Sequence, residues 1–247
     1  MNSLWLPLAL VLAYLIGSLS FAVIISRAMG LADPRSYGSK NPGATNVLRS
    51  GNKPAALLTL AFDALKGYVP VLLVLKYGGP NGGFGLGETA AAFVGLAAFF
   101  GHLWPVYFRF HGGKGVATAA GVLMAVNPLL GLATLLSFAI ILAFSRYVSL
   151  AAIVAAVFAP FYQALIWGPE PFILPLSMMS LLLVWRHEAN IRKLLAGTEN
   201  KFGQKAIAAP AGPTPVPVPA PAPNPASNPA PNPVPKRGRH AKHNKGQ

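Results

Sequence analysis

The residues best suited to chemistry in this sequence are polar groups that bind anions, and they occur in three separate clusters. The first cluster is the segment 38–49, GSKNPGATNVLR, which lies between two long apolar stretches. Small residues allow the backbone to approach a ligand closely, and hydroxyl, amide and guanidinium groups donate hydrogen bonds to anions. We therefore expect this segment to bind a phosphate through Ser39, Asn41, Thr45, Asn46 and Arg49.

The second cluster is the run GHLWPVYFRFHGGKGVAT at 101–118. Within it, Gly112, Gly113, Lys114 and Gly115 precede a predicted helix, whose first N–H groups favour an anion, and the lysine adds a positive charge. The GxxxxGKS/T spacing of a Walker P-loop is absent, so a nucleotide-binding loop of that type is not predicted. Two interpretations remain: a phosphate-binding turn, or a basic turn that only anchors the chain at the membrane edge.

The third cluster is RHEANIR at 186–192. His187 and Asn190 are three residues apart, so on a helix both side chains face the same side and can contact one ligand. Arg186 and Arg192 flank the pair and favour an anionic ligand. A structural histidine at the membrane interface is the alternative, but the paired histidine and asparagine favour a site.

Three further polar residues are expected to support the site. Asp63 and Lys66 are three residues apart within an apolar stretch, and charged groups inside a membrane usually face the bundle interior and pair. We expect an internal ion pair behind the site, in preference to direct contact with a substrate. His102 precedes a Trp-Pro break, and we favour structural support for it over polarisation of a substrate.

The residue types argue against metal-dependent and thiol chemistry. The sequence has six Asp and Glu residues, and they form no close cluster of the kind found in carboxylate-rich metal sites. Cysteine is absent, which excludes disulfides and thiolate ligands. Neither a G-x-S-x-G elbow nor a His-xxxx-Asp motif occurs. The remaining basic, amide and hydroxyl groups suit phosphate binding, and no metal or cofactor is predicted.

The elements that must position these clusters are membrane helices. Of the 247 residues, 53% are hydrophobic and 11% are charged, whereas a soluble domain carries about 25% charged residues. A helix needs about 20 apolar residues to cross a bilayer. We predict an all-α polytopic bundle of seven transmembrane helices, drawn from the apolar stretches 4–26, 54–76, 88–108, 115–127, 129–145, 148–167 and 171–186.

The distribution of charge sets the predicted orientation. With the N-terminus outside and the C-terminus in the cytoplasm, the basic residues gather in the cytoplasmic loops, and the outside loops keep only Lys76 among them. This rule explains the net charge of +14, so no nucleic-acid partner is predicted. The same topology places all three polar clusters on the cytoplasmic side of the membrane.

The chain is predicted to divide into a membrane domain, residues 1–203, and a disordered tail, residues 204–247. The tail is rich in Pro and Ala and ends in a basic stretch. Such a composition favours polyproline II conformations and is unable to build a core. The basic end could lie on anionic lipid, at about 1 kcal/mol per charge, or stay solvated, and we predict no catalytic role for it.

The three clusters and the sequence DALKG at 63–67 resemble the bacterial acyl-phosphate-dependent glycerol-3-phosphate acyltransferases, in order and spacing, over about residues 5–203. The resemblance implies transfer of a fatty acyl group from acyl phosphate to glycerol 3-phosphate, which gives lysophosphatidic acid and phosphate at the start of phospholipid synthesis. It also implies a seven-helix protein of the bacterial inner membrane that uses no metal or acyl carrier. The phosphate-binding residues that it implies are Ser39, Arg49, Lys114, His187 and Asn190.

The residue types suit that reaction. Arg49 and Lys114 can neutralise phosphate, and Ser39, Asn190 and the amides of 112–115 can donate hydrogen bonds to the phosphate or the developing oxyanion. A substrate phosphate is favoured as acceptor of the hydroxyl proton, with His187 as the alternative general base. The competing function is a membrane transporter of an organic phosphate, but the paired inverted halves usual in transporters are not evident.

Overall fold

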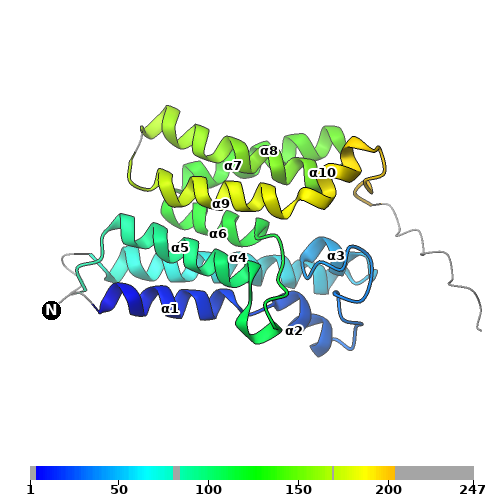
Figure 1. Cartoon of the computed structure of the whole chain (residues 1–247), viewed down its shortest axis with the longest axis horizontal. Helices are drawn as coiled ribbons and strands as arrows, with labels where there is room; N and C mark the ends of the chain where they lie inside the picture. Colours follow the sequence, from blue (N-terminus) through cyan, green and yellow to red (C-terminus); the bar gives the residue numbers. More distant parts are fainter. Residues whose placement is uncertain (1–3, 80–83, 169, 204–247) are drawn as a thin grey trace, which may run out of the picture. The chain divides into compact units, whose positions relative to one another are not determined.

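The structure, a computed structural model, describes residues 4–79, 84–168 and 170–203. The predicted tail at 204–247 lies outside the described residues. The described residues form a helical bundle, as the apolar stretches predict (Figure 1). In chain order its elements are α1 Trp5–Gly17, α2 Phe21–Ala28, α3 Ala44–Leu48, α4 Lys53–Tyr77, α5 Glu88–Leu103, the 3₁₀ turn η2 Val106–Phe108, α6 Val116–Val126, α7 Pro128–Ser145, α8 Val148–Tyr162, the π-helical turn η3 Gln163–Trp167, α9 Ile173–Arg186 and α10 Glu188–Leu195.

Several of these helices are membrane spans by length and composition. In the described part of the chain four stretches qualify alone, and α1 with α2, which meet at a bend of 42°, makes a fifth if the pair is one span. The helices α6 and α9 are apolar but contain 11 and 14 residues, shorter than the ~20 needed to cross the hydrocarbon core. The polytopic helical membrane protein is therefore confirmed, and the total of seven crossings stays a prediction.

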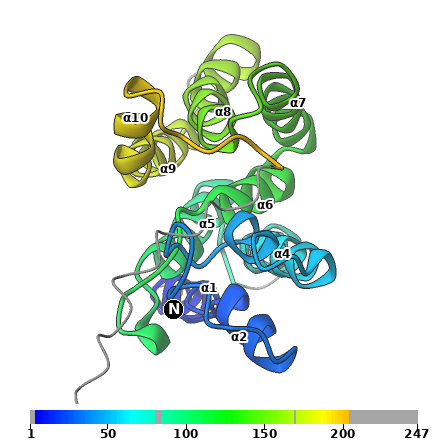
Figure 2. The ribbon, with the colours of Figure 1, turned by 90° about the vertical axis from the view of Figure 1, so that its right-hand side faces the viewer.

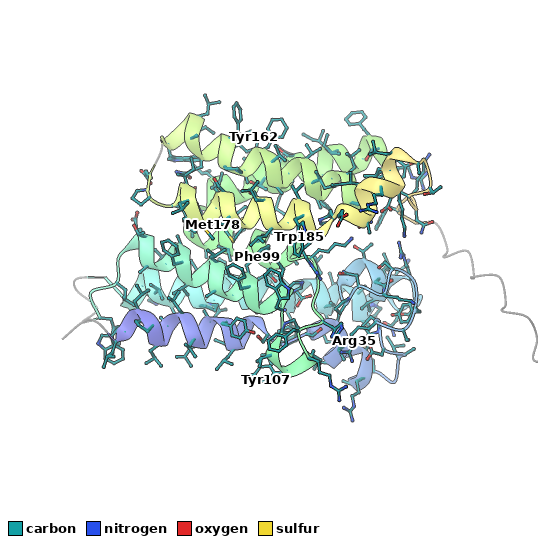
Figure 3. The ribbon with its side chains drawn as sticks, viewed as in Figure 1. Arg35, Phe99, Tyr107, Tyr162, Met178 and Trp185 are labelled. Carbon is teal, nitrogen blue, oxygen red and sulfur yellow. The ribbon has the colours of Figure 1, made fainter. Side chains whose placement is uncertain are left out.

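The surface of the bundle fits a lipid environment. Large apolar side chains such as Phe144 and Leu181 are 88% and 72% exposed. Hydrocarbon covers such side chains at no cost, whereas a soluble monomer rarely exposes extended apolar surface. The interior is packed with other apolar groups, among them Phe99 of α5, which lies between the layers of helices (Figure 3).

Helix α6 lies at the centre of the bundle, between α4 and α5 on one side and α7 on the other (Figure 2). Its close approach to α4 depends on two glycines. A Cβ at Gly67 of α4 would overlap the carbonyl of Thr118, and one at Gly121 of α6 would overlap the carbonyl of Ala64. Small residues at helix contacts allow such approach in membrane proteins. The start of α6, which follows the glycine turn of the second cluster, is thereby held against α4.

The three polar clusters gather at one end of the bundle. Figure 1 shows α3, which belongs to the first cluster, and α10, which belongs to the third, at the end where α5 finishes. The chain between α5 and α6, which contains the second cluster, also lies at this end. The alternating direction of successive helices returns residues remote in sequence to the same end.

Candidate active site

A cavity of about 670 Å³ contains residues from all three clusters. The structure brings together in its lining most of the residues predicted from the sequence: Ser39, Asn41, Thr45, Asn46, Arg49, Asp63, His102, Lys114, Gly115, His187 and Asn190. Three predicted residues, Lys66, Gly112 and Gly113, do not line this cavity. The carbonyls of Gly112 and Gly113 accept hydrogen bonds from Arg186, and Lys66 pairs with Asp63.

The first cluster forms a loop that is held by one buried amide. Asn46 is 2% exposed, and its Oδ1 accepts the backbone N–H of Ser39 at 3.0 Å. Its Nδ2 donates to the carbonyls of Pro34 and Tyr37 at 2.6 and 3.1 Å. Both ends of this amide are therefore used within the loop. Its geometry suits a residue that shapes the loop better than one that binds a ligand directly.

Other donors of the first cluster remain available to a ligand. The side chains of Ser39, Asn41 and Thr45 line the cavity, and they make no hydrogen bond with another side chain or backbone group in the described part of the chain. Arg49 caps the C-terminus of the short helix α3, and its Nη1 lies 3.5 Å from Oδ1 of Asn46. This contact is at the outer limit of a hydrogen bond, so most of the guanidinium is left to bind an anion.

The glycine turn of the second cluster is held from both sides. On one side the N–H of Gly113 donates to the carbonyl of His102 at 3.1 Å. On the other, Arg186 donates from Nε to the carbonyl of Gly113 at 3.2 Å and from Nη2 to that of Gly112 at 3.1 Å. Arg186 was predicted as a flanking charge, and the structure shows that it orients the turn.

The next residues of the turn lead into α6. Gly115 is the N-cap of α6 and has a φ of 85°, a left-handed conformation that favours glycine. A Cβ there would also overlap the ring of Phe99. The first N–H groups of a helix have no acceptor within the helix and form its positive end. Because Val116 and Ala117 line the cavity, this end of α6 faces the space in which an anion would bind.

A chain of hydrogen bonds joins the second and third clusters to α8. Nζ of Lys114 donates to Oδ1 of Asn190, and Nδ2 of Asn190 donates to Oε1 of Glu199 at 2.7 Å. The hydroxyl of Ser149 donates to the same carboxylate oxygen at 2.8 Å. Glu199 and Ser149 also line the cavity, and sequence reasoning did not single them out. The only local signal is that a carboxylate follows the third cluster closely in the chain.

The cavity is positively charged, and this affects Lys114. Burial lowers the pKa of Lys114 to about 8. The carboxylate of Glu199 opposes this change, and the nearby positive charges of Arg186, Arg49 and Lys193 add to it. Positive charges held close together in partial burial are unfavourable until an anion joins them. The site is therefore arranged to gain stabilisation when a phosphate binds.

His187 is a neutral histidine with a defined tautomer. It is 2% exposed, and its Nδ1 lies 2.8 Å from the carbonyl of Leu183. A carbonyl only accepts, so Nδ1 carries the proton and Nε2 keeps its lone pair. Burial, together with the charge of Lys114, lowers the pKa of His187 to about 4. At neutral pH this side chain adds no charge to the cavity.

The predicted ion pair lies at the cavity wall, where Asp63 lines the cavity and Lys66 does not. Nζ of Lys66 lies 2.7 Å from Oδ1 of Asp63, and both side chains are buried. Lys66 also donates to the carbonyl of Leu19, at the break between α1 and α2. Nδ1 of His102 lies 3.7 Å from the same carboxylate oxygen of Asp63. A buried carboxylate is thus shared by a lysine and a histidine from two helices.

The remainder of the cavity is largely apolar. It continues between α6, α7, α8 and α9, where its lining includes Ala152, Ala155 and Ala159 of α8 and Leu176 and Met179 of α9. The alanines leave room beside α8, and the lining offers no charged group along this part. One cavity therefore joins a basic end with several hydrogen-bond donors to a largely apolar groove, which suits a ligand with an anionic head and a hydrocarbon chain.

Comparison with known proteins agrees with this geometry. The sequence profile described as glycerol-3-phosphate acyltransferase matches residues 7–197. The glycerol-3-phosphate acyltransferase of Paraburkholderia phytofirmans is 59% identical over 206 residues, which cover 82% of this chain and 95% of that protein. The protein of the same name from Janthinobacterium sp. is 61% identical over 193 residues, covering 78% and 94% of the two chains.

Solved structures show the same fold. The crystal structure of PlsY, an integral membrane glycerol 3-phosphate acyltransferase, in its glycerol 3-phosphate form matches with a TM-score of 0.74 and 39% identity, over 80% of this chain and 96% of that chain. Its lysophosphatidic acid form matches with a TM-score of 0.72 and 38% identity, over 80% and 95% of the two chains. With matches of this extent in both sequence and structure, the chain belongs to the glycerol-3-phosphate acyltransferase family.

Proposed function

We propose that this chain transfers a fatty acyl group from an acyl phosphate to glycerol 3-phosphate and releases lysophosphatidic acid and phosphate. The observation that carries the proposal is the cavity that joins three anion-binding clusters to an apolar groove. Glycerol 3-phosphate and the phosphate of the donor would occupy the polar end, and the acyl chain would lie along α8. The family membership and the two ligand forms of the related PlsY structure support both the acceptor and the product.

The reaction replaces one acyl–oxygen bond with another. A hydroxyl oxygen of glycerol 3-phosphate attacks the acyl carbon, the bond from that carbon to the phosphate oxygen breaks, and the hydroxyl proton passes to phosphate. Arg49 and Lys114 neutralise the departing charge, and Ser39 and the first N–H groups of α6 stabilise the oxyanion. Holding both substrates in one cavity supplies the proximity on which such a transfer depends.

The lowered pKa of His187 supports phosphate as the proton acceptor. An efficient general base has a pKa near the working pH. The pKa of His187 is lowered to about 4, so its Nε2 is a weak base at neutral pH. We therefore assign it a role in binding phosphate, next to Asn190, and keep Ser39, Lys114, His187 and Asn190 as the proposed catalytic set. Among the residues predicted to bind phosphate, we assign Asn46 to shaping the loop.

The membrane topology belongs to the same proposal. Seven crossings, with the N-terminus outside and the C-terminus in the cytoplasm, would place the site on the cytoplasmic side of the bacterial inner membrane. The basic residues near the site end, such as Arg27, Arg35 and Lys40, support this orientation because cytoplasmic loops carry an excess of positive charge. Residues 1–203 would form the enzymatic domain of this protein.

The full-length protein, purified in detergent, tests the function directly. Incubation with palmitoyl phosphate and radiolabelled glycerol 3-phosphate is expected to form lysophosphatidic acid with one phosphate released per product. Palmitoyl coenzyme A in place of palmitoyl phosphate is expected to give no product, and Lys114→Ala to abolish the activity. If reconstituted vesicles accumulate glycerol 3-phosphate while no lysophosphatidic acid forms, the protein is a transporter and the proposal is wrong.

A further inference from the structure

The side chain of His102 connects a buried charge network to the glycine turn. His102 lies in the last turn of α5 and is 7% exposed. Its backbone carbonyl accepts the N–H of Gly113, and its ring lies directly against Gly113. If a Cβ is built at Gly113, the three nearest atoms are Nε2, Cε1 and Cδ2 of this ring. The ring of His102 therefore packs directly against the glycine turn at Gly113.

A buried ion pair lies behind the ring, close to it but beyond hydrogen-bond distance. Nδ1 of the ring lies 3.7 Å from Oδ1 of Asp63, and that oxygen lies 2.7 Å from Nζ of Lys66. The backbone carbonyl of Asp63 accepts the hydroxyl of Thr118 at 2.9 Å. Asp63 of α4 is thus bonded to α6 through its backbone, and its carboxylate lies beside the histidine ring of α5. Asp63 therefore lies between the histidine ring and the helix that the turn precedes.

The opposite side of the turn is held by Arg186 of α9, so the turn lies between the buried ring of His102 and the half-buried guanidinium of Arg186, which come from different helices. Lys114 follows Gly113 directly, and its ammonium group reaches Asn190. A shift of the turn would carry Lys114 with it. Misplacing a reacting group by about 1 Å can cost on the order of 10²-fold in rate.

On this basis we infer that His102 is a positioning residue, which fixes the Gly112–Gly115 turn through contact of its ring with Gly113 so that Lys114 meets the substrate phosphate. The inference rests on the proposed acyl transfer for its kinetic readout. It assigns to Asp63 and Lys66 the role of orienting the ring, and it involves no proton transfer by His102 itself.

A double-mutant cycle between His102 and Gly113 tests the contact. Gly113→Ala alone places a methyl group into the ring, and we expect kcat to fall at least tenfold. His102→Ala alone leaves the turn without its support, and we expect kcat to fall 10- to 100-fold, with the KM for glycerol 3-phosphate changing less. In the double variant the methyl group occupies space that the ring has vacated, so Gly113→Ala should cost less than threefold in that background.

Two further measurements and a matched control separate positioning from general stability. His102→Gln, whose longer side chain reaches the turn, should retain more activity than His102→Asn. Hydrogen exchange should rise in the peptide spanning Gly112–Gly115 in His102→Ala, while peptides of α7 keep their rates. His111→Ala serves as the matched control, because His111 is an exposed histidine of the same loop, and it should change neither activity nor exchange.

The outcomes distinguish this inference from the proposed function. If the wild-type protein forms no lysophosphatidic acid, acyl transfer is wrong, and the cycle is then read from the melting temperatures, where the same compensation is expected. If wild type is active but the two substitutions act additively in both kcat and melting temperature, the positioning role is wrong. Equal activity of His102→Gln and His102→Asn, with unchanged exchange at the turn, would also overturn it.

Discussion

The lowered pKa of Lys114 predicts that substrate affinity falls at moderately alkaline pH. Its ammonium group loses its proton near pH 8 instead of near 10.5, because burial disfavours the charged form. A difference of about 2.5 units corresponds to roughly 3 kcal/mol, at 1.36 kcal/mol per unit. That free energy disfavours the charge in the empty site, and a bound phosphate offsets it.

The protonation states of the lysine and the phosphate determine the direction in which the affinity for glycerol 3-phosphate changes with pH. The second pKa of a phosphate monoester is about 6, so glycerol 3-phosphate keeps a constant charge of −2 from about pH 7 upward. Below pH 8 Lys114 is charged, and the affinity should be nearly independent of pH. Above pH 8 the lysine must take up a proton to bind phosphate, so the affinity should fall by about tenfold per pH unit and about 100-fold by pH 10.

Isothermal titration calorimetry of glycerol 3-phosphate into the detergent-solubilised protein, from pH 7 to pH 10, measures this profile without using the labile acyl phosphate. Lys114→Arg keeps its charge over the whole range, so its profile should be flat. Lys76→Arg, at the other end of α4, is the matched control and should keep the wild-type break. A flat wild-type profile, or an unchanged break in Lys114→Arg, would refute the assignment to Lys114.

Three other substitutions test separate parts of the site. Glu199→Gln removes the charge from the carboxylate that holds Asn190, so kcat/KM should fall about tenfold, as for one charge-assisted hydrogen bond, while Glu188→Gln on the exposed face of α10 should have no effect. Gly115→Ala should lower the melting temperature, because left-handed backbone strain costs at least about 1 kcal/mol and the added methyl group overlaps the ring of Phe99. An unchanged melting temperature would contradict both the strain and the contact with Phe99. Ala155→Phe should shift the preference from palmitoyl towards shorter acyl phosphates by filling the groove, whereas Val157→Phe, which faces outward on the same helix, should not.

Some properties of the site were predictable because they depend on residue type alone. The anion-binding donors, the charge of Lys114 and the absence of thiol chemistry follow from which side chains occur and how closely they follow one another. The pairing of Asp63 with Lys66 was also predictable, since both residues lie on one helical face and charges in hydrocarbon seek a partner.

Other roles could not be predicted from spacing. Asn46 and Ser39 belong to the same motif and both carry hydrogen-bonding side chains, but the Asn46 amide bonds the loop backbone while the Ser39 side chain bonds no other protein group among the described residues. Arg186 looks like one basic residue among several in the sequence, yet it is the one that donates to the glycine turn. Several residues have suitable side chains for each of these contacts. The tertiary fold decides which of them lies close enough to make the contact.

The amino-acid sequence alone determined that this is a helical membrane protein with three clusters of basic, amide and hydroxyl side chains, because hydropathy, charge and glycine content act over a few neighbouring residues. The tertiary structure alone decided how the clusters are joined. It brings Glu199 to Ser149 across 50 residues and Lys114 to Asn190 across 76, and it continues their cavity into an apolar groove. Contacts between residues so far apart in the sequence depend on how the helices pack around α6, and that packing is a property of the whole folded chain.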